Sequence, residues 1–253
     1  QGIGVSLGVS IGNKAYIRET DMLDWFDQDP GTKAIAFYIE GFEKKEGRKF
    51  IQRAEQCSKP VVVLKAGKSK KGIEAVSRHT ASLAGDYRVF QEIMKQHCVA
   101  EADNEYEFTS FCEALSCYPR GIIGNVGIIS LSGGHGVIAA DACELHDLSL
   151  PKIDTTTMDT IKEKLSPGIR DIVSLVNPMD LTGSSQDSDI VTTARHLSRA
   201  PNVDCILALL IPYSPGVSTD IGAKLSQVAR NEGKPMIAYV PNEDKYKIII
   251  GGF

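Results

Sequence analysis

The 253-residue chain has no long hydrophobic segment. Its longest uninterrupted apolar run, residues 205–211, is far shorter than the roughly 20 residues that cross a bilayer as a helix. No basic segment followed by an apolar one opens the chain, so nothing resembles a secretory leader. These absences predict a soluble protein without a membrane partner.

Clustered basic residues are missing as well. Lys and Arg number 28 against 32 Asp and Glu, which gives a formal net charge of −4. Proteins that bind nucleic acids neutralise phosphates with grouped Lys and Arg, so we expect no nucleic-acid partner. The hydrophobic share of 42% and the charged share of 24% are ordinary for globular proteins and exclude disorder of the chain as a whole.

None of the six cysteines belongs to a CxxC pair. A chain of this length buries its own core without disulfides, and Cys205 lies in an apolar stretch where a thiol behaves as a small hydrophobe. We therefore expect reduced thiols, a cytoplasmic location and no metal site. The first residue is Gln1, and residues 247–253 show no helix or cap, so we expect a piece of a longer protein.

Short apolar segments alternate regularly with amphipathic ones. This pattern predicts strands at 2–11, 34–39, 60–65, 98–100, 126–131, 203–211 and 235–240, and helices at 19–27, 44–56, 86–96, 104–117, 137–145, 156–165, 188–199 and 220–231. Continuous apolar strands between helices indicate parallel sheets covered on both faces. The predicted fold is therefore α/β, with two doubly wound flavodoxin-like domains at residues 1–120 and 121–253. A Pro-Arg-Gly segment at 119–121 interrupts the alternation between them.

Ligands of such sheets bind at the carboxyl ends of the strands, so the segments after the strands matter most. Residues 66–85 are predicted to be a polar loop. The loop begins like the end of a phosphate-binding P-loop, but Val62 stands where that motif needs glycine, which excludes it. The nearby basic residues are interpreted as a solvated charge run: Lys65, Lys68, Lys70 and Lys71.

His79 is the candidate catalytic residue in this loop, since it is a histidine among small polar residues after a parallel strand. Glu40, which ends the neighbouring strand, is expected to accept a hydrogen bond from one ring nitrogen. The other nitrogen would then be free to act as a nucleophile. His97, His146 and His196 lie on helical stretches and are expected to be structural.

A second candidate site joins a strand to a helix. Its glycines and the helix N-terminus favour an anion, and the expected phosphate-binding residues are Ser132, Gly133, Gly134, His135 and Gly136. A tight structural turn explains the pattern equally well. Gly134, Gly136 and Ala139, with Asp154 further on, also imitate a dinucleotide-binding fingerprint.

Five motifs together resemble the NDP-forming acyl-CoA synthetases, the family of the ADP-forming acetyl-CoA synthetases and relatives of succinyl-CoA synthetase. They are Ser10-Ile-Gly-Asn13, Tyr38-Ile-Glu-Gly41, Arg78-His-Thr-Ala-Ser-Leu-Ala-Gly85, Ser132-Gly-Gly-His-Gly136 and Asn177-Pro-Met-Asp-Leu-Thr-Gly183. The resemblance covers nearly the whole chain in the right order. Two positions depart from the usual pattern, with Ala81 in place of Gly and His135 in place of Pro.

The resemblance implies an acid–thiol ligase that interconverts acyl-CoA, ADP and phosphate with a carboxylic acid, CoA and ATP through an acyl phosphate. His79 would carry the phosphoryl group, with Glu40 beside it. CoA and ATP or ADP with Mg²⁺ would be substrates, and no tightly bound cofactor is implied. The partners would be a CoA-binding domain and an ATP-grasp domain or subunit, neither present in this sequence, in an oligomeric enzyme acting on a small carboxylic acid.

Three other interpretations remain open. One is a catalytically silent regulatory or docking module of the same family. The second is a dinucleotide-binding α/β domain, which would leave the segment around His79 unexplained. The third is a flavodoxin-like structural or docking module without any chemistry.

Overall fold

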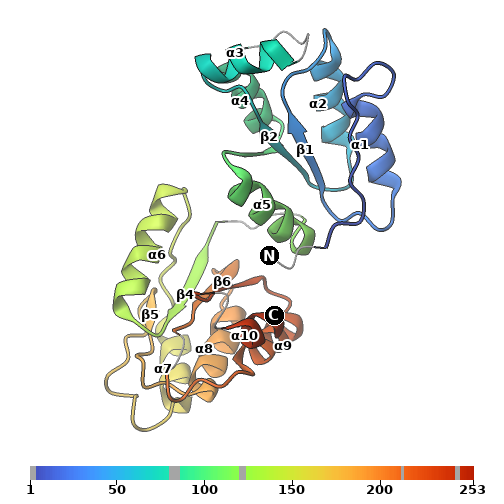
Figure 1. The fold of residues 1–253 in the computed structure, drawn as a ribbon. Helices are drawn as coiled ribbons and strands as arrows, with labels where there is room; N and C mark the ends of the chain where they lie inside the picture. The colour runs from blue at the N-terminus through green and yellow to red at the C-terminus, as the bar shows by residue number, and fades with distance from the viewer. Residues whose placement is uncertain (1–3, 80–85, 120–123, 212–213, 243–245) are drawn as a thin grey trace. The chain divides into compact units, whose positions relative to one another are not determined.

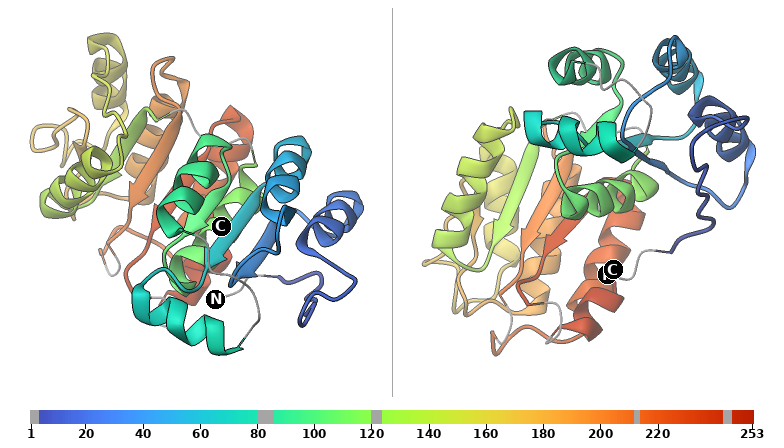
Figure 2. Two further views of the ribbon diagram at one scale, coloured as in Figure 1. Left: turned by 90° about the horizontal axis from the view of Figure 1, so that it is seen from above. Right: turned by 45° about the horizontal axis from the view of Figure 1, so that its top comes forward.

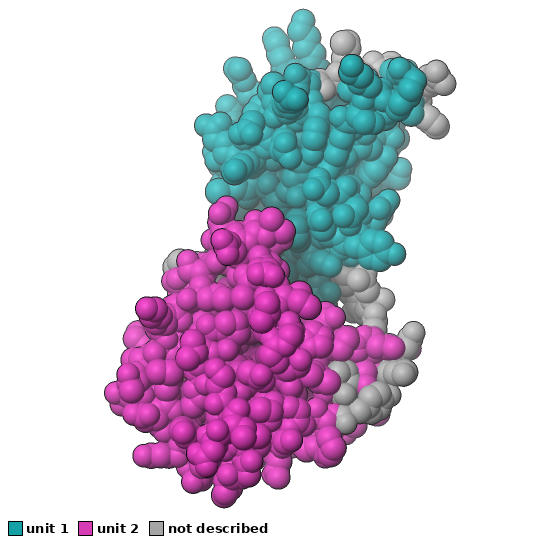
Figure 3. Space-filling view, turned by 90° about the vertical axis from the view of Figure 1, so that its left-hand side faces the viewer, with its two compact units in different colours: residues 1–121 teal, residues 122–253 magenta. Residues whose placement is uncertain are grey.

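The computed structural model describes residues 4–79, 86–119, 124–211, 214–242 and 246–253, without the side chains of Arg78 and His79. The chain divides into two compact units, Gln1–Gly121 and Ile122–Phe253, coloured separately in Figure 3. Each unit has its own sheet, with strand order β1-β2-β3 in the first and β5-β4-β6-β7 in the second. All strand pairs are parallel, so the predicted α/β class with parallel sheets is confirmed.

Unit 1 begins with a helix and continues by alternating strands and helices (Figure 1). Its elements are α1 (Glu19–Gln28), β1 (Ile35–Ile39), α2 (Glu46–Gln56), β2 (Val61–Lys65), α3 (Lys70–His79), α4 (Tyr87–Gln96), β3 (Ala100–Ala102) and α5 (Glu105–Cys117). The alternating pattern of β1 and the continuous burial of Val61, Val62 and Val63 in β2 make β2 the centre of the sheet.

The core of unit 1 lies between one face of its sheet and the helices α1, α2 and α4. Leu23, Phe50 and Met94 from these helices pack against the inward side chains of β1 and β2. Helix α5 contacts all three strands, and it has no fully buried residue. The side chain of Tyr38, which alternates with the buried residues of β1, is 62% exposed.

Unit 2 contains β4 (Val126–Ser130), α6 (Gly133–Leu145), α7 (Thr155–Lys164), β5 (Met179–Asp180), α8 (Asp187–Arg199), β6 (Cys205–Leu209), α9 (Ile221–Glu232), β7 (Met236–Tyr239) and α10 (Lys247–Gly251). Helix α6 covers one face of the sheet, and α8 and α9 cover the other (Figure 2). The chain runs from β4 to β5 on one side and on to β6 on the other, so the strand order reverses between β4 and β6. Ligand sites of doubly wound sheets lie at such a reversal.

The side chain of Asn177 forms hydrogen bonds with main-chain groups of β4 that the very short strand β5 does not reach. Its side-chain oxygen accepts from the Ile128 amide at 2.9 Å, and its amide group donates to the Val126 carbonyl at 2.9 Å. One side chain thus satisfies main-chain groups that a longer β5 would otherwise pair. This is a structural role for the motif that begins at Asn177.

Some predictions of secondary structure are wrong, and the strand predicted at 98–100 lies instead at Ala100–Ala102. Residues 70–79 of the predicted loop form α3, because Ile73 and Val76 recur at helical spacing and the Ser69 hydroxyl accepts from the Gly72 amide at 3.1 Å in the first turn. Residues 247–251 form the short helix α10, whose Ile249 packs into the core of unit 2.

Residues 4–11 form no strand, although their apolar residues alternate. Val5, Leu7 and Val9 are exposed by 78%, 46% and 49%. A strand needs a neighbour for its N–H and C=O groups, and no strand of the described residues pairs with this segment. The described residues also include no helix long and apolar enough to cross a membrane.

Candidate functional site

Glu40 directly follows β1, at the edge of the unit 1 sheet where the carboxyl ends of its parallel strands meet. Its side chain is partly buried. The Tyr38 hydroxyl donates a long hydrogen bond of 3.5 Å to Glu40 Oε1. Partial burial of the phenol and the neighbouring charge of Glu40 both raise the pKa of Tyr38. Glu40 therefore lies at the end of its strand, as the sequence predicts.

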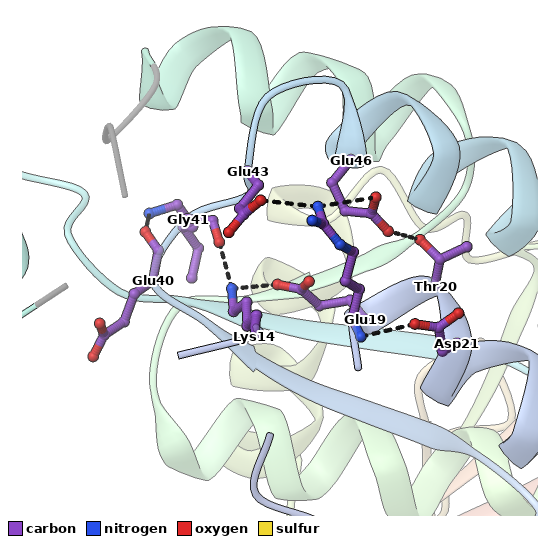
Figure 4. A network of polar contacts seen from close by, with 10 residues as sticks. Lys14, Glu19, Thr20, Asp21, Glu40, Gly41, Glu43 and Glu46 are labelled. Atoms are coloured by element: carbon purple, nitrogen blue, oxygen red, sulfur yellow. Dashed lines mark hydrogen bonds and ion pairs between the residues drawn. The ribbon is translucent and has the colours of Figure 1, made fainter. Parts of the chain in front are cut away.

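Two lysines hold the main chain at this position. Lys65 Nζ donates to the Glu40 carbonyl at 2.7 Å and also to the Ala66 carbonyl. Lys14 Nζ donates to the Gly41 carbonyl at 2.7 Å and pairs with Glu19 (Figure 4). The turn that carries Glu40 is thereby attached both to β2 and to the segment before α1.

The predicted solvated charge run is correct for Lys70 and Lys71 and wrong for Lys65. Lys71 is exposed and pairs with Glu74 at 3.0 Å. Lys65 is only 6% exposed, and this burial lowers the pKa of its ammonium group. The negative charges of Glu101 and Glu40 act in the opposite direction and raise it. Its position at the end of a continuous apolar strand is the signal from which burial was predictable.

Lys68 lies at the start of the same segment and contacts the last strand of the sheet. Its ammonium group donates to the Asp103 carboxylate at 2.8 Å and to the Ala102 carbonyl at 3.1 Å. Although burial opposes it, the hydrogen bond to Asp103 raises the pKa of Lys68. Gly67 just before it has a positive φ of 73°, a conformation that favours glycine.

His79 is the last residue of α3. Its side chain lies outside the described residues, as do residues 80–85 with Ala81. The predicted pairing of His79 with Glu40 therefore stays a prediction. The backbone places the histidine at the end of a helix rather than within a long loop.

The turn between β4 and α6 is the second candidate site. Ser130 Oγ donates to the Ser132 carbonyl at 2.6 Å and accepts from the Ser132 amide at 3.1 Å. Ser132 is the N-cap residue of α6, yet its side chain makes no capping hydrogen bond. The hydroxyl of Ser130 thus fixes the turn and leaves that of Ser132 unused by the helix.

The first amides of α6 have no acceptor within the helix. The Gly136 amide donates to the Ser132 carbonyl at 3.1 Å. The N–H groups of Gly133, Gly134 and His135 precede that bond, as at any helix start. Gly133 and Gly134 are exposed, so these donors are accessible to an anion.

Asp180, the last residue of β5, also lies at this turn. The sequence analysis did not assign it to this site. Its Oδ2 is 3.0 Å from the position that a Cβ on Gly133 would occupy, so a side chain at that position would require the Asp180 carboxylate to shift. Its Oδ1 accepts from the Thr182 amide at 2.9 Å. A carboxylate beside a helix N-terminus is favourable, but it opposes a second anion there. The phosphate-binding role of the turn stays a prediction.

His135 lies in the first turn of α6. Its Nδ1 is buried and has no hydrogen-bond partner among the described residues. Its ring centroid is 6.4 Å from that of Tyr239, at an interplanar angle of 41°. A role of the His135 ring at the phosphate site therefore stays a prediction.

We expect His135→Pro to be nearly silent. Proline fits the first turn of a helix, and it removes a buried ring nitrogen that lacks a partner. The free energy of unfolding should stay the same or rise by up to about 1 kcal/mol. Urea unfolding of the two proteins measures this, and a clear loss of stability would show that the His135 ring or amide supports α6.

The dinucleotide-binding interpretation requires Asp154 to be available for a ribose, and the structure contradicts this. Both oxygens of Asp154 cap α7, accepting from the Thr157 amide at 2.8 Å and the Thr157 hydroxyl at 2.7 Å. A ribose-binding carboxylate has to be free for a ligand. Asp154 is instead used by its own helix.

Comparisons with known proteins agree on one family. Residues 1–115 match the family described as "Succinyl-CoA ligase like flavodoxin domain". The chain is 34% identical over 243 residues to acetate–CoA ligase (ADP-forming) II subunit alpha of Pyrococcus furiosus, an alignment that covers 93% of this chain and 51% of the relative. It is 38% identical over 213 residues to acetate–CoA ligase (ADP-forming) I of Archaeoglobus fulgidus, with coverages of 83% and 30%. The chain thus spans about half of one curated relative and less than a third of the other.

A solved structure is similar over both units. It is the "dinucleotide forming Acetyl-coenzyme A synthetase 1" of Ca. Korarchaeum cryptofilum in complex with phosphate and ADP. The TM-score is 0.82 at 27% sequence identity, and the match covers 96% of this chain and 52% of that one. The similarity therefore includes the folds of both sheets.

Proposed function

The chain belongs to the NDP-forming acyl-CoA synthetase family, and from this premise we propose that it is the part of such an acid–thiol ligase that carries the phosphohistidine. The main support is a fold match that covers 96% of the chain, to a synthetase solved with phosphate and ADP. The position of Glu40 at the carboxyl edge of its sheet agrees with this proposal.

The proposed reaction has three steps. Phosphate displaces CoA from an acyl-CoA and gives an acyl phosphate and free CoA. His79 then attacks the phosphorus, the carboxylic acid leaves as its carboxylate, and the imidazole carries the phosphoryl group. ADP accepts that group, which forms ATP and restores the neutral ring. Imidazole suits this role because it is a good neutral nucleophile near pH 7.

Glu40 is proposed to accept a hydrogen bond from the imidazole N–H of His79. This bond selects the tautomer that leaves the other nitrogen free. It also stabilises the positive charge that develops on the ring as the N–P bond forms. Because Glu40 ends a buried strand, its main chain offers a rigid base for this interaction.

The turn from Ser132 to Gly136 is proposed to hold a phosphate group at the start of α6. The amides of Gly133 and Gly134 supply donors that need no reorganisation when the anion arrives. The nearby Asp180 carboxylate disfavours a dianion at Gly133 itself. A phosphate would therefore bind on the side of the turn away from Asp180.

The complete enzyme is proposed to include a CoA-binding domain and an ATP-grasp domain or subunit and to form an oligomer. Its substrates would be a small carboxylic acid, CoA and ATP or ADP with Mg²⁺. The relative from Pyrococcus furiosus is an alpha subunit by name, which supports the need for another subunit. All six cysteines are free, which suits a reducing cytoplasm.

Replacing Glu40 tests its proposed role. Glu40→Gln keeps the shape of the side chain but loses its charge and its control of the tautomer, so turnover of the complete enzyme should fall by about 10²-fold. Steady-state kinetics of acyl-CoA formation measure this. The matched control is Glu43→Gln in the same turn, since Glu43 is half-exposed and pairs with Arg18 at 2.9 Å. Equal rates for the two variants would contradict the role of Glu40.

A further inference from the structure

We propose that Lys14 and Lys65 are positioning residues that hold the main chain of Glu40 and thereby orient its carboxylate. We refer to Lys14 and Lys65 as the lysine pair. This inference rests on the proposed function of Glu40. It concerns two side chains that no motif of the sequence analysis assigned to the reaction.

The lysine pair holds two successive carbonyls from different parts of unit 1. Lys65, at the end of β2, donates to the Glu40 carbonyl at 2.7 Å. Lys14, from the segment before α1, donates to the Gly41 carbonyl at 2.7 Å. Because each ammonium group has a further acceptor, at Ala66 and Glu19 respectively, neither lysine is free to swing away. The peptide groups on either side of Gly41 Cα are therefore fixed.

The carboxylate of Glu40 is left available by this arrangement. Among the described residues, its one hydrogen bond is the 3.5 Å contact from the Tyr38 hydroxyl. In Figure 4 the Glu40 side chain points away from the network of Lys14, Glu19 and Gly41. The lysine pair thus binds the main chain, and among the described residues it forms no ion pair with the carboxylate that is proposed to act.

Burial of the two ammonium groups has an energetic cost. Lys65 is 6% exposed, and the side chains of Lys14 and Glu19 are 20% and 3% exposed. Apolar side chains often replace buried ions without loss of stability. Stability alone therefore does not explain charged donors at these two places, whereas a rigid base for Glu40 does.

Lys59 provides a matched control within the same unit. Its ammonium group also donates to two carbonyls, those of Phe26 at 2.6 Å and Asp29 at 2.5 Å. It precedes β2 and so lies at the amino edge of the sheet, at the opposite end from Glu40. Lys59→Met removes the same kind of contact without touching the turn of Glu40.

Hydrogen exchange tests the physical part of the inference, independently of any activity. The reporter at the carboxyl edge is the Ala66 amide, which donates to the Ile39 carbonyl at 2.9 Å, and the reporter at the amino edge is the Ile35 amide, which donates to the Pro60 carbonyl at 2.9 Å. In the complete enzyme, Lys65→Met should speed exchange at Ala66 by about 10-fold or more, since hydrogen bonds from charged donors are lost. Lys59→Met should leave Ala66 unchanged. Unchanged exchange at Ala66 in Lys65→Met would overturn the inference.

Phosphorylation kinetics test the functional part. With [γ-³²P]ATP and Mg²⁺, the complete Lys14→Met and Lys65→Met enzymes should each label His79 about 10-fold more slowly or worse, with KM for ATP unchanged. Lys59→Met should label at the wild-type rate. Lys14→Arg keeps the charge and the donors, so it should restore most of the rate lost in Lys14→Met.

A double variant separates positioning from a general structural effect. If Lys65 acts through Glu40, Lys65→Met combined with Glu40→Gln should be no slower than Glu40→Gln alone. Losses that multiply would overturn the inference, because Lys65 would then act by another route. An unlabelled wild-type enzyme would instead reject the proposed function, and the exchange at Ala66 would still decide whether the lysine pair holds the turn.

Discussion

His79→Asn should abolish both turnover and phosphoryl labelling of the complete enzyme. Asparagine keeps the size and polarity of the side chain but has no nucleophilic ring nitrogen, so the phosphohistidine cannot form. Because the replacement is of similar size and polarity, the fold should persist. Steady-state turnover, labelling with [γ-³²P]ATP and circular dichroism of the same preparation measure the three outcomes.

His97→Asn is the matched control for this variant. His97 follows α4 and its Nδ1 lies 2.5 Å from Glu55 Oε1, so it too is a histidine beside a glutamate. It precedes β3 and hence lies at the amino edge of the sheet. Its replacement should leave turnover near the wild-type rate. Normal turnover by His79→Asn would show that another group carries the phosphoryl.

The isolated chain, residues 1–253, should form no acyl-CoA from a carboxylic acid, CoA and ATP. The expected reaction needs a CoA-binding domain and an ATP-grasp region, and the chain spans only 51% of the alpha subunit it resembles and 52% of the similar solved chain. A thiol-release or hydroxamate assay with acetate as the probe acid measures thioester formation. The control is the same assay on the full-length protein together with its nucleotide-binding part.

Robust ATP- and CoA-dependent thioester formation by the isolated chain would contradict this assignment. It would mean that the two units contain sites for CoA and nucleotide. The proposed division of labour between this chain and the missing domains would then be wrong.

Much of the fold was predictable because the strands carry strong local signals. The apolar runs of β1, β2, β4 and β6 predict buried parallel strands, and the structure has strands at each of them. The position of Glu40 follows from the same reasoning, since the residue after a parallel strand lies at the carboxyl edge of its sheet. These inferences need only the local sequence and the rules of sheet topology.

The missed features depend on contacts between distant segments. Segment 4–11 has the alternating pattern of a strand, but among the described residues no strand pairs with it. Helix α10 forms because Ile249 packs into the core of unit 2. The role of the lysine pair was not predictable from the local sequence. Lys14 and Lys65 donate to successive carbonyls only in the folded unit, where β1 and β2 are paired. Asp180 was missed for the same reason, since β5 brings it to the start of α6.

The most direct test is to map the phosphoryl group on the complete wild-type enzyme. After brief reaction with [γ-³²P]ATP and Mg²⁺, peptides prepared at alkaline pH are sequenced by mass spectrometry. The account predicts one acid-labile, base-stable phosphoryl group, located on His79. A label on His135 or on a carboxylate, or no label at all, would contradict it.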